Sequence, residues 1–408
     1  MLAIPILIFG WQAFNRPTFF QPLGLTIPLL LLTAITAVSI FYSAVDGRLA
    51  AIILARLLIS LLLYFSLKSS WLTFNSIFSA FLIFFAVQGI AAIIQYWTQD
   101  DLGLQWLGEL DLAPEPGRGS IIFGQGEYWL RSYGLAPHPN ILGGLVGSAL
   151  LIVCFSRNHV CPPWFSWLAP IGIFFGAMGL CFTFSRSAWL GTAVGLLFGL
   201  FLKFLSDLLA SSTEQKTFQS RIQHFIKVAI LQLAPLALAV AVFIPAARGP
   251  LQARSQPQES QVVTQSVGER QILIDVAFDL IGDSFPWGVG AGNFGPAMLL
   301  HPDKETFPNI HPVHNLPMLL TAELGLLGGA TWVWLMLFPA GYGLIALIRR
   351  PDALTAPMIG LIAALLVLAT VDLLDYYSWG WPHGLTWRWM LFALLGKACA
   401  DQTSSSLH

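Results

Sequence analysis

Charged residues are scarce in this sequence: Asp, Glu, Lys and Arg make up 10% of its 408 residues. Soluble domains carry about 25%, so the composition excludes an ordinary soluble protein. Hydrophobic residues make up 56% of the chain, and several apolar runs approach or exceed the roughly 18–20 residues that a bilayer span requires. The composition therefore predicts an all-α polytopic membrane protein.

Cysteine is also scarce. The four cysteines fall in apolar runs or short basic loops without C-x-x-C spacing, which argues against a disulfide framework or a zinc site; they are Cys154, Cys161, Cys181 and Cys399. The first residues, "MLAIPILIFGWQAFNR", lack both a basic n-region and a small-residue cleavage site. We therefore expect them to form a short first helix and not a signal peptide.

The apolar runs predict eleven transmembrane helices, near residues 1–14, 23–42, 49–67, 71–97, 138–156, 164–184, 187–206, 228–246, 316–347, 355–371 and 386–398. The loops between them are either short and basic or long, the long ones being 98–137 and 247–313. The positive-inside rule places the short basic loops in the cytoplasm and the two long loops outside. We expect three segments: 1–124, with the N-terminal helices and first outer loop; 125–345, the core; and 346–408, the C-terminal helices and tail.

Unusual residues collect on the predicted outer face. Arg131 and His138 precede the fifth span in "RSYGLAPHPNILGG", where Asn140 is expected to cap the helix. Arg186 lies in a break between two spans, which must be a turn at the membrane surface. Arg56 is different because it lies inside the third span, and we expect it to reach a headgroup or a polar group of a neighbouring helix.

The second long loop, 247–313, is predicted to contain an amphipathic helix. Its apolar positions repeat with helical spacing at Leu273, Val276, Ala277, Leu280 and Ile281. Arg270 falls on the same stripe, so its guanidinium is expected to point toward protein and to require an anionic partner. The loop continues through "WGVGAGNF", which lacks the preceding strand of a dinucleotide site and so predicts a turn.

The loop ends in "IHPVHN", and the helix that follows carries the most informative pattern. Asn315 can cap this helix, whose N-terminus favours anions and lowers the pKa of a nearby histidine. At 100° per residue, Gly325 and Gly328 lie near the face of His314 and allow a neighbouring helix to approach. Glu323 lies about 180° away and is expected to be a buried structural hydrogen-bonding group.

We hypothesise that several arginines and a neutral histidine converge on an anionic substrate. The alternative for Arg131, Arg186 and Arg270 is contact with lipid headgroups. The alternatives for the histidines are a cap or core position for His314 and a loop position for His138 and His311. A metal site formed by His311, His314 and Asp303 or Glu305 is not favoured, because the spacing is unspecific.

The sequence His314-Asn315, nine residues, then Gly325-x-x-Gly328 resembles the H[NSQ]-x9-G-x-x-G signature of the O-antigen ligase family, which shares its core with Wzy-type polysaccharide polymerases. "RSYGLAPHPNILGG", "FSRSAWLG" and "FPWGVGAGNF" are similar to weaker blocks of that family. The resemblance covers roughly residues 125–345. Its ligases are expected to have twelve spans, one more than the eleven found here.

The resemblance implies a membrane glycosyltransferase of the cell inner membrane whose active face is periplasmic. Such an enzyme moves a glycan from an undecaprenyl-diphosphate carrier to lipid A core or to a growing polysaccharide, without a nucleotide sugar, cofactor or metal. His314 matches the general base, with His311, Asn315, Gly325, Gly328 and Glu323 as supporting residues. Arg186 and Arg270 match the positions that hold the diphosphate, and we add Arg131 as a third. The expected partners are the donor, the acceptor and membrane lipids, with no nucleic acid.

Two other functions remain open from the sequence. A carrier of bicarbonate or another anion would also place arginines on an outer face, but it should show inverted repeats, discontinuous helices and charges at the midplane. A non-catalytic component of a polysaccharide export complex would not need the His314-Asn315 motif.

Overall fold

The computed structural model describes residues 22–43, 45–70, 72–124, 126–160, 168–209, 218–254, 260–301 and 310–405. Within these ranges the chain is mostly helical, and seven helices are long and apolar enough to cross a membrane, as expected of a multi-pass membrane protein. The predicted first helix, 1–14, lies outside the described residues. Two shorter apolar helices, Ala169–Phe182 and Ala356–Asp372, match two further predicted spans.

The chain forms two compact units, each assembled from separate stretches of sequence. The first unit comprises Met1–Trp71, Gln261–Pro339 and Asp372–His408, and the second comprises Leu72–Ser260 and Ala340–Val371. Neither unit follows the predicted boundaries 1–124, 125–345 and 346–408. That three-segment division of the sequence stays a prediction.

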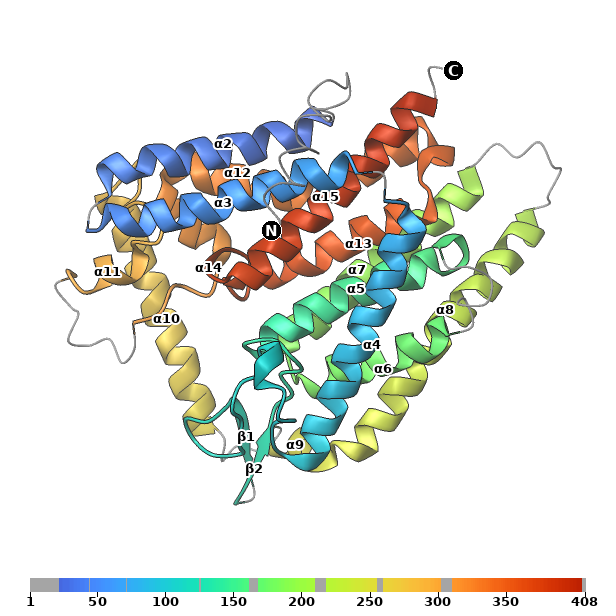
Figure 1. Ribbon diagram of the computed structural model, residues 1–408, viewed down its shortest axis with the longest axis horizontal. Coiled ribbons are helices and arrows are strands. Elements are labelled where there is room, and N and C mark those ends of the chain that lie inside the picture. The colour runs from blue at the N-terminus through green and yellow to red at the C-terminus, as the bar shows by residue number, and fades with distance from the viewer. Residues whose placement is uncertain are drawn as a thin grey trace. The chain divides into compact units, whose positions relative to one another are not determined.

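The second unit is a helical bundle held by close glycine contacts. Helices α4, α5, α6 and α7 pack against one another, as Figure 1 shows. A Cβ on Gly89 of α4 would meet the backbone of α6, and one on Gly191 of α7 would meet the carbonyl of Val367. Small residues let apolar helices approach this closely in a membrane. Its helices are α4 (Phe74–Thr98), α5 (Pro139–Val160), α6 (Ala169–Phe182), α7 (Arg186–Leu209), α8 (Phe218–Ala246), α9 (Arg248–Ala253) and nearly all of α13 (Ala356–Asp372).

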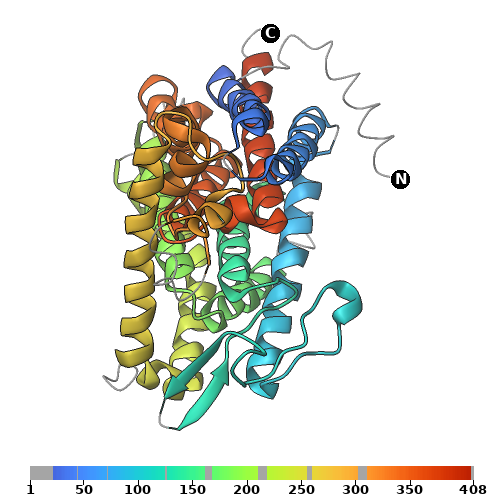
Figure 2. The same ribbon diagram turned by 90° about the vertical axis from the view of Figure 1, so that its left-hand side faces the viewer.

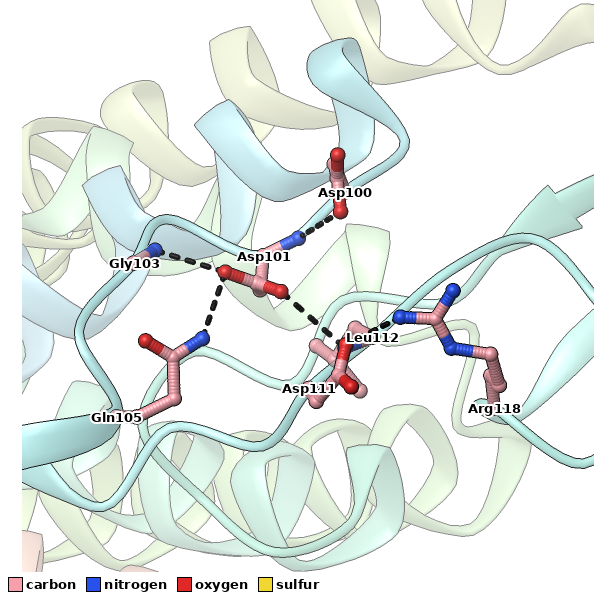
Figure 3. Close-up of polar contacts among 7 residues, drawn as sticks. All are labelled: Asp100, Asp101, Gly103, Gln105, Asp111, Leu112 and Arg118. Atoms are coloured by element: carbon pink, nitrogen blue, oxygen red, sulfur yellow. Dashed lines mark hydrogen bonds and ion pairs between the residues drawn. The ribbon is translucent and has the colours of Figure 1, made fainter.

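The first long loop, which follows α4, contains structure that the all-α prediction missed. Strands β1 (Ile121–Gly124) and β2 (Glu127–Leu130) form an antiparallel hairpin beside the end of α4, as Figure 2 shows. The short 3-10 helix η1 (Gln105–Leu107) precedes it. The carboxylate of Asp101 accepts from Gly103 N at 2.8 Å and from the Gln105 side chain at 2.8 Å (Figure 3). The carboxylate of Asp101 is therefore occupied in holding the loop together.

The first unit contains α2 (Leu23–Tyr42), α3 (Gly47–Lys68), α10 (Ser260–Asp283), α11 (Phe294–Met298), α14 (Tyr377–Gly380), α15 (Pro382–Ser405) and most of α12 (Leu316–Arg349). The amphipathic helix predicted in the second long loop is α10. Its stripe is buried at Leu273, Val276, Ala277 and Leu280, while Asp275 is exposed. The remaining short element is η4 (Pro351–Ala353), which belongs to the second unit.

Helix α12 is broken at Gly325, where φ is 70° and ψ is −172°. Residues 286–290, which we call the strap, lie against the break. Leu326 N donates to Pro286 O at 3.0 Å, while Val289 N donates to Ala322 O at 2.8 Å and Gly290 N to Glu323 O at 2.8 Å. The segment that lies close against Gly325 is therefore the backbone of the strap, which is a loop. The prediction of a neighbouring helix at this position was wrong, because a glycine stripe does not reveal that the helix itself breaks.

The first unit also buries a charged network. Arg388 pairs with Asp372 at 2.7 Å, and each side chain is 1% exposed. The indole N–H of Trp332 donates to Asp372 at 3.1 Å, and the Arg388 guanidinium lies 5.1 Å from the Trp332 ring centre. A buried ion pair needs such additional contacts to offset the loss of hydration. The network fixes the start of α15 against the end of α13.

Candidate functional site

His314 stands two residues before α12 and is half-buried. Its Nδ1 atom is buried and has no hydrogen-bond partner among the described residues. The ring of Tyr376 packs edge-on against the imidazole, with centroids 5.3 Å apart and planes at 78°. With Nδ1 turned inward, Nε2 is the nitrogen that can meet a substrate.

Burial is the main reason why the pKa of His314 lies below its ordinary value, because burial disfavours the charged imidazolium. The carboxylate of Asp375 opposes this and raises the pKa, while the positive charge of Arg270 and the neighbouring His311 lower it further. The sequence predicted the direction of this shift but attributed it to the helix end. The resulting neutral imidazole can accept a proton.

The segment 372–379 forms the other side of this site, and sequence analysis missed it. Asp375 is buried, accepts from Tyr376 N at 2.8 Å, and is the carboxylate that acts on His314. The side-chain amide of Asn315 donates to Leu373 O at 3.3 Å. The sequence offered one signal, two acids in the apolar stretch "VDLLDYYSW", where a carboxylate is costly without a purpose.

Asn315 performs the capping role predicted for it. Its Oδ1 accepts from Met318 N at 3.0 Å, which satisfies one of the free amides of the first turn of α12. Because its Nδ2 also reaches Leu373 O, Asn315 holds the segment 372–379 beside His314.

Arg270 and His311 join His314 in the first unit, since the charges of both lower the pKa of His314. Arg270 is exposed on α10, so the prediction that its guanidinium points toward protein was wrong. The stripe becomes buried only from Leu273 onward, whereas Arg270 lies nearer the start of the helix. An exposed guanidinium close to the imidazole is better placed to meet an anion that arrives from outside.

Arg131 lies in the second unit and is occupied by the protein itself. It donates to Thr183 O at 2.8 Å, to Ser120 Oγ at 2.9 Å and to Asn140 Oδ1 at 2.7 Å. His138, and not Asn140, supplies the cap of α5, because its Nδ1 accepts from Asn140 N at 3.1 Å. These contacts favour a structural role for Arg131, and its predicted contact with a diphosphate stays a prediction.

Arg186 is the first residue of α7 and is exposed, and it makes no hydrogen bond or ion pair with the part of the chain that the structure describes. The predicted break between two spans is confirmed by the turn at Thr183–Ser185. Phe184 adopts a left-handed φ of 48° in this turn, and Arg254 donates to its carbonyl at 2.9 Å. The guanidiniums of Arg131 and Arg254 thus bind two successive carbonyls of the turn that presents Arg186.

Glu323 is 3% exposed and accepts from Trp379 Nε1 at 3.0 Å and from Phe294 N at 3.4 Å. This arrangement fits the structural role expected of it. A Cβ on Gly328 would meet the side chain of Leu324 in its own helix. Two members of the metal site that was not favoured, Asp303 and Glu305, lie outside the described residues.

Part of the chain that contains this site is similar to a known protein family. Residues 171–333 match the family model described as O-antigen ligase. A comparison with curated proteins gave no match. The matched range includes Arg186, Arg270 and the His314-Asn315 motif with both of its glycines. The resemblance that the motif indicated is therefore confirmed over residues 171–333, where the chain is similar to the O-antigen ligase family.

Proposed function

We propose that this protein transfers a glycan from an undecaprenyl-diphosphate carrier to an acceptor hydroxyl at the periplasmic face of the cell inner membrane. The family match supports glycan transfer in polysaccharide biosynthesis as the general activity. The observation that carries the proposal is the environment of His314, a half-buried imidazole with an unpartnered Nδ1, close to the charges of Asp375 and Arg270.

In the proposed reaction, Nε2 of neutral His314 removes the proton from the acceptor hydroxyl. The hydroxyl oxygen forms a bond to the anomeric carbon, and the bond between that carbon and the diphosphate breaks with inversion. The electron pair leaves with the lipid diphosphate. Asp375 stabilises the imidazolium that forms, and Arg270 neutralises charge on the leaving group. The diphosphate contact that the sequence predicts at Arg186, in the second unit, stays a separate prediction. An activated donor needs neither a metal nor a second catalytic carboxylate.

One observation favours anion transport as a second candidate: α12 is discontinuous at Gly325, as transporter helices often are. Transporters use the backbone groups freed by such a break to bind ions. Here those of Ala322, Glu323 and Leu326 are paired with the strap. The break therefore serves packing, and transfer is the better-supported function.

The test compares surface glycans in cells that carry His314→Ala, Arg270→Ala or the control Arg48→Ala. Arg48 is an exposed arginine at the start of α3 in the same unit. Loss of a general base lowers the rate about 10²–10⁴-fold, so His314→Ala should abolish the glycan ladder on gels, and Arg270→Ala should weaken it. Normal ladders in both variants would refute the enzymatic function. Loss of labelled bicarbonate uptake with intact ladders would establish transport instead.

A further inference from the structure

The first unit contains a groove between two membrane-spanning helices. Its walls are formed by residues 31–42 of α2 and residues 324–330 of α12, and the strap adds Pro286 and Trp287. The volume of the groove is about 650 Å³, within the roughly 300–1,000 Å³ that is typical of ligand sites. All of these residues belong to the first unit, so the groove is complete within that unit.

The strap lies at the end of the groove that faces the membrane surface. Tyr42 is the last residue of α2, and the centre of its ring lies 6.4 Å from that of Trp287. The side chain of Trp287 is 67% exposed. Tyrosine and tryptophan are enriched where membrane spans meet the lipid headgroups. We therefore take Tyr42 and Trp287 as the rim of the groove.

From this rim the groove extends into the span by the depth of one leaflet. Leu31, at the other end of the α2 wall, lies eleven residues before Tyr42, which is about 16 Å along the helix axis. The hydrocarbon core of a bilayer is about 30 Å thick, so that one leaflet contributes about 15 Å. The groove therefore has the length of one hydrocarbon chain of one leaflet.

The chemistry of the lining fits an acyl chain and not the chain of a lipid diphosphate. Among the described residues that line the groove none is charged, and the two polar side-chain groups, the Tyr42 hydroxyl and the Trp287 indole N–H, both lie at the rim. A diphosphate would require arginine or lysine at this position. A pair of aromatic rings can instead hold the ammonium group of a zwitterionic headgroup.

We propose that this groove binds one acyl chain of a zwitterionic phospholipid, with the headgroup ammonium at the Tyr42–Trp287 rim. The chain packs against Leu326 and Leu327, each of which is 56% exposed, and covering such apolar side chains stabilises the helices that carry them. The site does not depend on the proposed function.

The bound chain acts on the strap, because the strap is held between the two helices of the groove. Gly290 N donates to Glu323 O of α12 at 2.8 Å. The next residue, Ala291, donates from its N–H to Ser39 Oγ of α2 at 3.3 Å. The lipid therefore supports the contact of α2 with the break in α12, and its removal should loosen the strap.

The experiment labels the full-length protein in detergent with a phosphatidylethanolamine that carries a diazirine halfway along one acyl chain. We expect saturable labelling, with adducts located by mass spectrometry on residues 31–42 and 324–330. Leu327→Trp fills the groove and should weaken binding of the probe about tenfold. Leu337→Trp is the matched control, because Leu337 lies in the same helix and is 63% exposed but does not line the groove.

Competition identifies the occupant. Unlabelled phosphatidylethanolamine should displace the probe, phosphatidylglycerol should do so less well because its headgroup has no ammonium, and a prenyl diphosphate should not do so. Phosphatidylethanolamine should also raise the melting temperature of the wild-type protein, because a ligand that binds the folded state stabilises it. The melting temperature of Leu327→Trp should not respond.

Several results would overturn the inference. Labelling that does not saturate, or that spreads over all the lipid-facing helices, would make the groove an ordinary bilayer contact. A prenyl diphosphate that displaces the probe as well as phospholipid does would assign the groove to the donor. Phosphatidylglycerol that competes as well as phosphatidylethanolamine would refute the assigned headgroup.

The variants provide a separate criterion. Equal labelling of Leu327→Trp and Leu337→Trp would show that the chain does not lie in the groove. If Leu327→Trp does not fold, Ala330→Leu adds a smaller volume at another lining position, and unchanged labelling of that variant would count equally against the site.

Discussion

Gly325→Ala is expected to destabilise the protein strongly although it adds one methyl group. With φ at 70° and ψ at −172°, Gly325 occupies a backbone region that is essentially restricted to glycine. Holding another residue there costs about 1–3 kcal/mol. The added Cβ would also overlap Pro286 O and lie 2.7 Å from the carbonyl carbon of Trp287. Both are backbone atoms, so the strap itself must move.

Movement of the strap adds to the backbone cost. The hydrogen bond from Leu326 N to Pro286 O, 3.0 Å long, would be lost or distorted, at a further cost of about 0.5–1.5 kcal/mol. The sum is about 1.5–4.5 kcal/mol. We expect the melting temperature of the purified protein in detergent, followed by intrinsic fluorescence, to fall by several degrees.

Gly341→Ala is the matched control. Gly341 lies in the same long helix, and a Cβ there would meet nothing within 4 Å. Alanine in a helix interior is favoured over glycine by about 0.5–1 kcal/mol, so this variant should melt at or slightly above the wild-type temperature. If Gly325→Ala melts together with Gly341→Ala, the helix break does not carry the strain assigned to it.

Three further predictions concern His314 and the buried ion pair. Because the pKa of His314 is lowered, transfer should remain constant above about pH 6.5 and fall only at lower pH, as His314 gains a proton; a decline that begins above pH 7 would contradict this. Asp375→Asn removes the charge that raises the pKa of His314, so the acid limb of the pH profile of kcat should move to lower pH. Transfer at neutral pH should slow about tenfold or more. An acid limb that does not move would show that Asp375 does not act on His314. Arg388→Leu leaves the buried Asp372 unpaired and should cost about 3–5 kcal/mol, while Asp372→Asn combined with Arg388→Leu should cost less. Equal melting temperatures for these single and double variants would show that the pair does not act as a unit.

The sequence predicted the helices well where the period of apolar residues was unambiguous. Helix α2 has the predicted bounds, and α10 buries the predicted stripe from Leu273 onward. The signal is strong because a long apolar run or a regular stripe depends on neighbours in sequence. The exposure of Arg270 was mispredicted because periodicity gives the face of a helix but not how far a neighbour covers that face.

The partners of His314 could not be predicted in the same way. Asp375 lies 61 residues after His314 in the chain, and neither spacing nor composition indicates that the two meet. Their contact depends on the fold of the first unit, which brings together three separate stretches of sequence. The same applies to Arg56, whose Nη1 donates to Gly380 O at 3.4 Å, since the sequence required a polar partner for Arg56 without identifying it.

Gly325 of the motif has a structural role that depends on such long-range contacts. The strap follows directly from the end of α10, the helix that carries Arg270, and it pairs with α12 at Gly325. Next to the break, Glu323 binds Trp379, which belongs to the segment that holds Asp375 beside His314. Gly325 thus joins the helix of Arg270 to the helix of His314, although it lies eleven residues after the histidine. A larger residue at Gly325 should therefore reduce transfer at temperatures where the protein is still folded, because it displaces Arg270 from His314.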